Sequence, residues 1–212
     1  MSFILTLTGP SCAGKTTLER KLKEVGFEPV ISTTTRPIRE GEINGENYYY
    51  VTREEFAELI GHDRLIEHIE FGGNCYGISR EEIQRVFDNH KPIVIVVEPQ
   101  GLKQIKEYSK KMGWEVYSVF VDNPPKVIAG RFLKRFIDDV KNATNENDIY
   151  KVYTSRLADI MTIEAAWRVE AYNSRSDLYS VVIDAFDETN DRQIVAEFMK
   201  LILDVRHKSL IA

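Results

Sequence analysis

Cysteine is scarce in this sequence, whose 212 residues include only two, Cys12 and Cys75. Neither belongs to a spaced set of cysteines and histidines, which argues against a structural zinc site and against a disulfide framework. Two cysteines without such a framework fit a reducing compartment, so we predict a cytoplasmic protein. Whether the two thiols approach one another stays open at this level.

Long apolar runs are also absent. The longest, IVIVV at 93–97, fits one buried strand and is much shorter than the roughly 20 residues of a membrane-spanning helix. The first residues, MSFILTLTGPS, carry no basic segment and lead directly into a glycine motif, so they predict a first strand and not a signal peptide. The sequence therefore predicts no association with a membrane.

Positive charge does not predominate either, because 28 lysines and arginines are outnumbered by 33 aspartates and glutamates and the net charge is −5. Such a balance argues against a long surface for a nucleic-acid polymer. A small anionic ligand is still compatible with it, since local arginines can outweigh the global sign. No internal repeat or low-complexity linker divides the chain, and its length fits one domain with a substantial core or one domain that carries a small insertion.

Strand-like and helix-like segments alternate, which predicts an α/β fold with a parallel, doubly wound sheet. The strands are expected at 3–8, 47–51, 65–71, 93–98, 116–121 and 179–184. The helices are expected at 16–25, near 53, near 80, at 102–112, from Pro125, at 155–172 and at 191–207. Capping-box patterns at 52–55 and 79–82 predict two of these helix starts. The polar segment 143–148 predicts a mobile loop.

The first strand and helix flank GPSCAGKT at 9–16, which matches the phosphate-binding pattern G-x-x-x-x-G-K-[ST]. Glycines let consecutive N–H groups surround a polyphosphate, and the helix N-terminus adds a favourable dipole. Lys15 would reach the β- and γ-phosphates, and the Thr16 hydroxyl would bind Mg²⁺. A plain glycine turn is the alternative, but the strand before and the helix after the motif favour the phosphate site.

Arginines accompany this motif. Arg36 and Arg39 lie in TTTRPIRE, where the intervening proline predicts a rigid loop, and Arg131 and Arg135 lie four residues apart on one helix face. Arg156 is predicted at the start of the next helix. One such pair is usually a solvated surface, but several arginines near a phosphate loop fit phosphoryl transfer, which concentrates negative charge on the transferred group.

Two glutamates lie on predicted strands. Glu98 ends an apolar strand, where a carboxylate can hold a metal-bound water or a ligand hydroxyl, or can simply face solvent. Glu67 shares a face with Leu65, Ile69 and Phe71 if 65–71 is a strand. A carboxylate on an apolar face needs a partner, and the N1–H and 2-amino donors of guanine would supply two hydrogen bonds. A different strand phase and a structural ion pair are the alternatives.

Together these segments resemble the guanylate kinase family over roughly residues 3–190. GPSCAGKTT at 9–17 resembles the family's ATP loop. STTTRPIREGEINGENYYYV at 32–51 is similar to its monophosphate-binding segment, with the arginine pair, Gly-Glu, Asn-Gly and tyrosine in register. LIEHIEFGGNCYGIS at 65–79 resembles the segment with the base-binding glutamate and phosphate-binding tyrosine. EPQG at 98–101 resembles its Asp-x-Gln-Gly stretch, and the later arginine-bearing helices resemble its lid.

This resemblance implies a P-loop nucleoside monophosphate kinase fold with a core at 1–32 and 91–212, a helical lid near 132–156, and a small, mostly β domain for the monophosphate at 33–90. It implies a transferase of nucleotide metabolism that passes the γ-phosphate of ATP to a GMP- or dGMP-like purine monophosphate, with Mg²⁺ as cofactor. Closure of the small domain and the lid would bring the two phosphates in line and exclude water. The expected partners are small nucleotides, with a monomer or homodimer as the assembly.

The resemblance also implies residue roles. ATP would be bound by Gly9, Ser11, Cys12, Ala13, Gly14, Lys15, Thr16 and Thr17. The acceptor monophosphate would be bound by Ser32, Arg36, Arg39, Tyr48, Glu67, Tyr76, Ile78 and Glu98, with Arg36, Arg39, Tyr48 and Tyr76 on its phosphate and Ser32 and Glu67 on its base. Catalysis would depend on Lys15, Arg36, Arg131, Arg135 and Arg156. Mg²⁺ would be held by Thr16 and, through water, by Glu98.

The glycine-rich stretch FGGNCYGIS at 71–79 is predicted to close over the acceptor, and it also contains a departure from the family. Ile78 stands where the family has a hydroxyl residue that contacts the 6-oxo group of guanine. Losing one such hydrogen bond costs on the order of 1 kcal/mol, so we predict relaxed or altered preference at purine position 6. Val96 and Asp184 also depart from the family's magnesium and adenine positions, and 137–154 predicts a longer lid connection.

Other functions remain open on the same fold. A phosphoprotein-binding module without catalysis is one, but such modules typically lack the phosphate loop that Gly14, Lys15 and Thr16 preserve here. A kinase of another nucleotide or of a sugar phosphate is a second, disfavoured by Glu67 and the tyrosines. A GTPase or motor-type ATPase is a third, disfavoured by the absence of an Asn-Lys-x-Asp motif.

Overall fold

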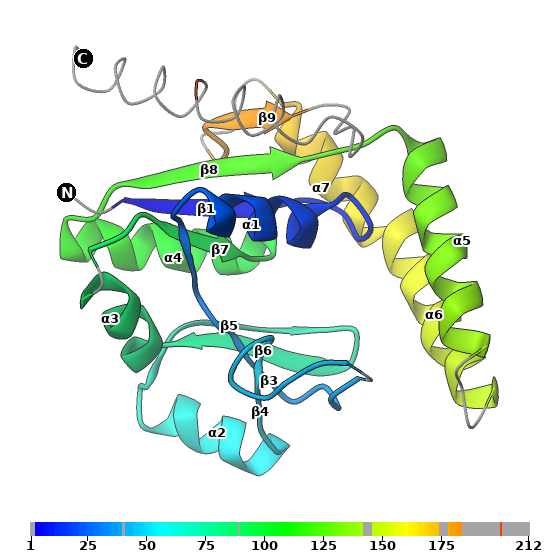
Figure 1. Cartoon of the computed structure of the whole chain (residues 1–212), viewed down its shortest axis with the longest axis horizontal. Coiled ribbons are helices and arrows are strands. Elements are labelled where there is room, and N and C mark those ends of the chain that lie inside the picture. The colour runs from blue at the N-terminus through cyan, green and yellow to red at the C-terminus, as the bar shows by residue number, and fades with distance from the viewer. Residues whose placement is uncertain are drawn as a thin grey trace. The chain divides into compact units, whose positions relative to one another are not determined.

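A computed structural model describes residues 3–39, 41–88, 90–141, 146–173, 178–183 and 200 (Figure 1). The chain divides into two compact units, Met1–Thr6 with Lys23–Val116 and Leu7–Leu22 with Tyr117–Ala212. Strand β1 (Ile4–Thr8) and helix α1 (Lys15–Glu24) each run from one unit into the other. The domain boundaries at 33 and 90 that the sequence suggests stay a prediction.

The first unit contains part of a parallel sheet. In it β2 (Glu28–Pro29), β7 (Ile93–Val96) and the start of β1 are neighbours in that order, and Glu28 is paired with Ile93. Helix α4 (Pro99–Met112) follows β7. It starts at a proline, whose missing N–H is harmless in a first turn, and ends at Gly113 in the left-handed region.

A second, four-stranded sheet in the same unit has the strand order β4-β3-β6-β5. Its strands are β4 (Tyr49–Tyr50), β3 (Thr33–Thr34), β6 (Asn74–Ser79) and β5 (Leu65–Phe71). The expected strand at 65–71 is confirmed, whereas the expected strand at 47–51 is only two residues long. The glycine-rich segment at 71–79 is the turn and second strand of a hairpin, because β5 and β6 pair antiparallel.

The glycines of this hairpin have local structural roles. Gly72 and Gly73 have φ values of 58° and 73°, as a two-residue hairpin turn of the glycine-rich type requires. Gly77 lies inside β6, where an added Cβ would come within 2.9 Å of the Glu67 carbonyl oxygen. That these glycines also close over a nucleotide stays a prediction.

Two helices flank the hairpin as the capping patterns predict. Thr52 and Glu55 form a complete capping box at the start of α2 (Arg53–Gly61). At α3 (Arg80–Asp88) the Ser79 hydroxyl accepts a hydrogen bond from the Glu82 N–H at 3.1 Å, which confirms the helix start. The capping box is not completed by a bond from the Ser79 N–H to Glu82. The buried Glu82 carboxylate instead accepts hydrogen bonds from the Ile31 N–H, the Tyr49 hydroxyl and Arg85.

The second unit continues the parallel sheet with the end of β1, β8 (Val116–Val121) and β9 (Val181–Ile183) as neighbours in that order. The parallel pairing of β8 with β9 and of β2 with β7, together with the helices between strands, confirms the α/β prediction. Helix α5 (Pro125–Lys141) begins at the second of two prolines, as predicted.

Helices α6 (Glu146–Met161) and α7 (Ile163–Ala171) correct two expectations. The predicted single helix over 155–172 is two helices that meet at Thr162, and the predicted loop at 143–148 overlaps the first turn of α6. Tyr153 of α6 packs between Phe132 and Phe136 of α5, with ring centroids 5.3 and 4.9 Å away. Asp184 and, apart from Lys200, the expected helix at 191–207 lie outside the described residues.

Each unit has its own apolar core. Among the fully buried side chains of the first unit are Ile4, Leu5, Ile78, Val86, Ile93, Val94, Ile95, Leu102 and Ile105. Among those of the second are Leu7, Leu18, Leu22, Phe120 and Val121. None of the described helices combines the length and apolar character that crossing a membrane requires.

Candidate active site

The phosphate loop in the second unit lies between β1 and α1. Gly9 starts it with φ of 145°, and a Cβ there would lie 2.0 Å from the Val121 carbonyl oxygen, so only glycine fits. The loop ends at Lys15, the first residue of α1, and the Leu18 N–H donates to the Gly14 carbonyl at 3.0 Å. The N–H groups ahead of that bond are those that a helix N-terminus offers to an anion.

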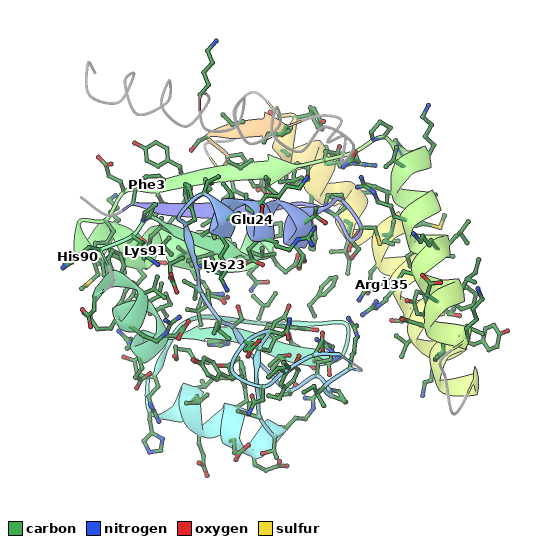
Figure 2. The ribbon with its side chains drawn as sticks, viewed as in Figure 1. Phe3, Lys23, Glu24, His90, Lys91 and Arg135 are labelled. Carbon is green, nitrogen blue, oxygen red and sulfur yellow. The ribbon has the colours of Figure 1, made fainter. Side chains whose placement is uncertain are left out.

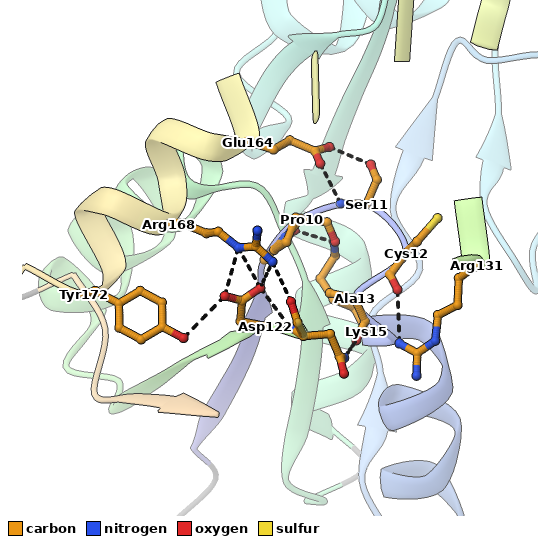
Figure 3. Close-up of polar contacts among 12 residues, drawn as sticks. Pro10, Ser11, Cys12, Ala13, Lys15, Asp122, Arg131, Glu164, Arg168 and Tyr172 are labelled. Carbon is orange, nitrogen blue, oxygen red and sulfur yellow. Dashed lines mark hydrogen bonds and ion pairs between the residues drawn. The ribbon is translucent and has the colours of Figure 1, made fainter. Parts of the chain in front are cut away.

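Side chains from the loop itself and from later segments donate hydrogen bonds to its carbonyl groups (Figure 3). Lys15 Nζ donates to the carbonyls of Gly9 at 2.5 Å and Pro10 at 2.9 Å. Asn123 Nδ2 donates to the Ala13 carbonyl at 2.7 Å, and Arg131 Nη1 donates to the Cys12 carbonyl at 3.1 Å. The loop is therefore fixed by its own lysine and by residues that follow β8 or lie on α5.

A carboxylate holds the outer side of the loop. Glu164 of α7, only 2% exposed, accepts hydrogen bonds from the Ser11 N–H at 2.9 Å and the Ser11 hydroxyl at 2.6 Å. Sequence reasoning missed this glutamate. It follows no motif and is separated from Ser11 by 153 residues, and the apolar helix face that buries it is the only signal the sequence offers.

An ion pair links α7 to the end of β8. Arg168 Nε and Nη2 donate to the buried Asp122 carboxylate at 2.9 and 2.5 Å, and Nη2 also donates to the Asn123 carbonyl at 2.6 Å. Tyr172 donates to the same carboxylate at 3.3 Å. This cluster positions Asn123, whose side chain donates to the Ala13 carbonyl. Helix α7 therefore supports the phosphate loop directly through Glu164 and indirectly through Arg168.

Four of the five cations that the sequence suggested for catalysis, all but Arg36, act on this loop. Burial raises the pKa of the Cys12 thiol, while the nearby charges of Arg135, Lys15 and Arg156 oppose the rise. Arg131 also donates a hydrogen bond to the Cys12 carbonyl, so all four of these cations interact with Cys12. The side chain of Arg135 projects from α5 (Figure 2). Arg156 lies within α6, over the Tyr153 ring, and not at a helix start as expected.

The residues predicted for the acceptor phosphate meet in the first unit around Glu42. Arg36 Nη1 and Nη2 donate to its carboxylate at 3.0 and 2.8 Å. The Arg39 N–H donates at 2.8 Å and the Tyr50 hydroxyl at 2.7 Å. Burial would raise the pKa of Glu42, but the hydrogen bonds from Arg36, Tyr50 and Arg39 outweigh it and lower that pKa to about 2. Sequence reasoning noted the Gly-Glu pair but gave Glu42 no role.

Aromatic rings complete this cluster. The Arg36 guanidinium lies 5.3 Å from the centroid of the Tyr48 ring and 5.7 Å from that of Tyr50. Tyr76 packs edge-on against Tyr48 with centroids 6.2 Å apart. Arg36, Tyr48 and Tyr76 are thus brought together, and the Arg39 backbone meets Arg36 at the Glu42 carboxylate.

Glu67 lies deeper in the first unit. Its side chain is 4% exposed, and Oε2 has no hydrogen-bond partner among the described residues. Burial, with a smaller effect from the charge of Glu98, raises the pKa of Glu67 to about 8. The carboxyl group has room because α4 has a glycine at 101, where a Cβ would lie 2.6 Å from Oε2.

The strand register defines what surrounds Glu67. Glu67 is paired with Ile78 across β5 and β6, so their side chains share a face of the sheet. Thr33 is paired with Gly77 across β3 and β6, and continuing this register by one residue places Ser32 opposite Ile78. Glu67, Ile69 and Phe71 share one face of the strand, as expected. Leu65 does not follow this alternation, because a β-bulge lies between it and Glu67, and both Leu65 and Ile66 are buried.

Metal-binding side chains do not cluster in the described part of the chain, which contains no group of three or more His, Cys, Asp or Glu suited to an ion. Thr16 is exposed at the start of α1, beside the loop N–H groups. A hydroxyl in that position fits Mg²⁺ that takes most of its ligands from nucleotide phosphates and water.

Comparisons with known proteins agree with this geometry. Residues 2–158 match the family model for guanylate kinase. The chain is 34% identical to a guanylate kinase of Trichormus variabilis, covering 77% of this chain and 88% of that protein. It is 44% identical to one from Nostoc sp., covering 49% of this chain and 53% of that protein. The crystal structure of guanylate kinase from Anaplasma phagocytophilum shares the fold, with a TM-score of 0.59, 23% identity, and coverage of 96% of this chain and 85% of that one. This chain belongs to the guanylate kinase family.

Proposed function

We propose that this protein transfers the γ-phosphoryl group of ATP to GMP or dGMP and so forms the nucleoside diphosphate. The observation that carries the proposal is the number of cations at the phosphate loop. Lys15 and Arg131 donate hydrogen bonds to its carbonyl groups, and the charges of Arg135 and Arg156 act on its Cys12 thiol. The relatives named guanylate kinase support the same reaction. Neither a plain glycine turn nor a binding module without catalysis needs four cations at one loop.

In the proposed reaction an oxygen of the acceptor phosphate forms a bond to the γ-phosphorus, the bond from that phosphorus to the β–γ bridging oxygen breaks, and ADP leaves with the electron pair. The acceptor oxygen is already anionic, so no strong general base is needed. Catalysis is then positioning and charge neutralisation, which the lysine and arginines supply. Bound phosphate would draw Lys15 Nζ away from the loop carbonyls that it now contacts.

The acceptor phosphate would bind the donors of Arg36, Arg39, Tyr48 and Tyr76. Glu42 has a positioning role, because its bidentate hydrogen bonds fix the orientation of the Arg36 guanidinium before the phosphate binds. Since the pKa of Glu42 is lowered to about 2, this carboxylate stays ionised throughout the physiological pH range. Arg36 thus keeps its orientation without losing all of its donors, since a guanidinium has five.

Magnesium would be held by the Thr16 hydroxyl and the ATP phosphates, and it would neutralise charge on the β- and γ-oxygens. A second link through a water on Glu98 is part of the proposal. Val96 occupies the position where the family has another acid, so the protein's own share of the magnesium ligands is small here.

At the base, Glu67 would accept hydrogen bonds from the purine 2-amino group and its neighbour, and Ser32 would contact position 6. Ile78, which is fully buried opposite Glu67, cannot contribute a hydrogen bond. Preference at position 6 is therefore relaxed or altered relative to the family.

A panel of monophosphates tests this function, with ATP and Mg²⁺ and with diphosphate as the measured product. We expect turnover of GMP and dGMP and none of dTMP. Lys15→Ala should reduce kcat by orders of magnitude. Lys23→Ala removes the same charge from an exposed position in the last turn of α1 and is the matched control (Figure 2). Turnover of pyrimidine monophosphates alone, or equal activity in both variants, would contradict the proposal.

A further inference from the structure

Strand β5 lies at one end of the four-stranded sheet, where only β6 is beside it among the described strands. Such an edge strand presents N–H and C=O groups that no neighbouring strand pairs. At His68 a side chain of α4 bonds both groups. The His68 N–H donates to Gln104 Oε1 at 3.1 Å, and Gln104 Nε2 donates to the His68 carbonyl at 2.9 Å. The Gln104 amide therefore takes the place of a neighbouring strand at this residue.

His68 directly follows Glu67, the residue that we propose binds the base. The pairing of β5 with β6 is interrupted just before Glu67, because the register shifts at a bulge between Leu65 and Glu67. A bulge leaves its extra residue unpaired and disrupts the ladder locally. The backbone at Glu67 is therefore held by β6 on one edge only from that residue onward, and by Gln104 on the other edge at the next residue.

The position of the Glu67 carboxyl group depends on this backbone. Glu67 is 4% exposed and its Oε2 has no hydrogen-bond partner among the described residues, so that oxygen is not fixed by a bond of its own. Packing confines it instead, because a Cβ at Gly101 would lie 2.6 Å from Oε2. Gly101 and Gln104 are three residues apart on α4 and so lie on one helix face. That face leaves room for the carboxyl group and also bonds the strand that carries it.

We propose that Gln104 is a positioning residue for base selection, which acts by holding β5 so that Glu67 meets the base in one orientation; this inference rests on the proposed kinase function. Guanine presents two adjacent donors, its N1–H and its 2-amino group, and hydrogen bonds to both require a well-defined position of the acceptor. Adenine has no donor at these two positions. A displaced β5 therefore weakens the binding of GMP much more than that of AMP.

The test compares kcat/KM for GMP and for AMP in the wild type and in Gln104→Met, with ATP and Mg²⁺. Methionine has nearly the length of glutamine and suits a helix, but it cannot make the bonds to His68. We expect kcat/KM for GMP to fall about tenfold, mainly through KM, while kcat/KM for AMP and the KM for ATP change by less than about twofold. Gln84→Met is the matched control, because Gln84 is exposed on α3 and bonds within its own helix to Asp88 at 2.8 Å. It should leave the ratio of GMP to AMP unchanged.

A double-mutant cycle tests whether Gln104 acts through Glu67. Glu67→Ala should reduce the preference for GMP, and adding Gln104→Met to it should leave the remaining ratio of GMP to AMP unchanged. Equal effects of Gln104→Met with and without Glu67 would show a general structural role and overturn the inference. Gln104→Asn keeps the amide on a side chain that is one methylene shorter, so it should lower the ratio as well. It decides the question if Gln104→Met does not fold.

The remaining outcomes separate this inference from the proposed function. A wild type that phosphorylates GMP, with a ratio of GMP to AMP that Gln104→Met and Gln104→Asn leave unchanged, overturns the role of Gln104 while the kinase function stands. A loss of the same size for GMP and AMP also overturns that role. Folded wild-type protein that phosphorylates neither nucleotide overturns the kinase function itself.

Discussion

Glu67→Gln is expected to change the pH dependence of folding stability, whatever the substrate is. The folded protein holds a proton on Glu67 up to about pH 8, whereas an unfolded chain releases it near the ordinary value of 4.5. Between these values the folded state binds more protons than the unfolded state. The free energy of unfolding therefore falls as the pH rises through this window. The amide that the substitution introduces has the same shape as the carboxyl group and does not titrate.

The size of the effect follows from the shift. Each pH unit within the window changes the free energy by about 1.4 kcal/mol, which gives roughly 3 kcal/mol between about pH 5.5 and about pH 7.5. Solvent screens this site little, because Glu67 is only 4% exposed. The wild type and the variant should have similar stability at the acid end, and the variant should become the more stable protein as the pH rises.

Urea unfolding of both proteins over this pH range measures the difference. Glu70→Gln is the matched control, because Glu70 lies on the same strand with 63% of its side chain exposed and pairs with Arg53 at 3.5 Å. Its stability should follow the wild type at every pH. Equal pH slopes for wild type and Glu67→Gln would refute the claim that Glu67 is buried as the acid.

Three further substitutions test the two sites. Gly101→Ala places a methyl group 2.6 Å from Glu67 Oε2, so overpacking of about 1–3 kcal/mol should exceed the helix-propensity gain of at most about 1 kcal/mol. The free energy of unfolding should therefore fall, and an unchanged urea midpoint would contradict this expectation. Glu164→Gln deprives Ser11 of a charged acceptor, so the KM for ATP should rise while that for the acceptor stays constant; the opposite split would count against the assignment. Glu42→Gln weakens the hold on its arginine partner, so the KM for the acceptor should rise while that for ATP stays constant, as initial rates at saturating co-substrate would reveal.

Local patterns explain why much of the fold could be predicted. Capping residues and strand alternation depend on neighbours in the sequence, so the starts of α2 and α3 and the outline of β5 follow from the residues themselves. The bulge after Leu65 could not be predicted, because it depends on how β5 pairs with β6. The break at Thr162 has no glycine or proline to mark it, and its hydroxyl bonds back to the Ala158 carbonyl at 2.7 Å, as threonine does where it competes with helix geometry.

The same distinction applies to the sites. Residues within motifs, such as Lys15 and Arg36, could be predicted from the chemistry that their spacing suggests. Residues that support them could not, because Glu164 reaches Ser11 only through the tertiary fold. Glu42 was visible within its motif, but only its contacts distinguish a residue that holds an arginine from one that faces solvent.

The first unit contains two glutamates in opposite electrostatic environments, and we propose that they serve the two ends of the acceptor nucleotide. Glu42 is surrounded by donors, so its pKa falls to about 2 and it can orient an arginine toward a phosphate without changing charge. Burial, with a smaller effect from the charge of Glu98, raises the pKa of Glu67 to about 8. A phosphate requires fixed positive charge, whereas a base is distinguished by where hydrogens lie. Replacement with glutamine removes a negative charge at Glu42, whereas at Glu67 it fixes one hydrogen-bond donor and one acceptor. The same chemical change should therefore alter phosphate affinity at Glu42 and base preference at Glu67.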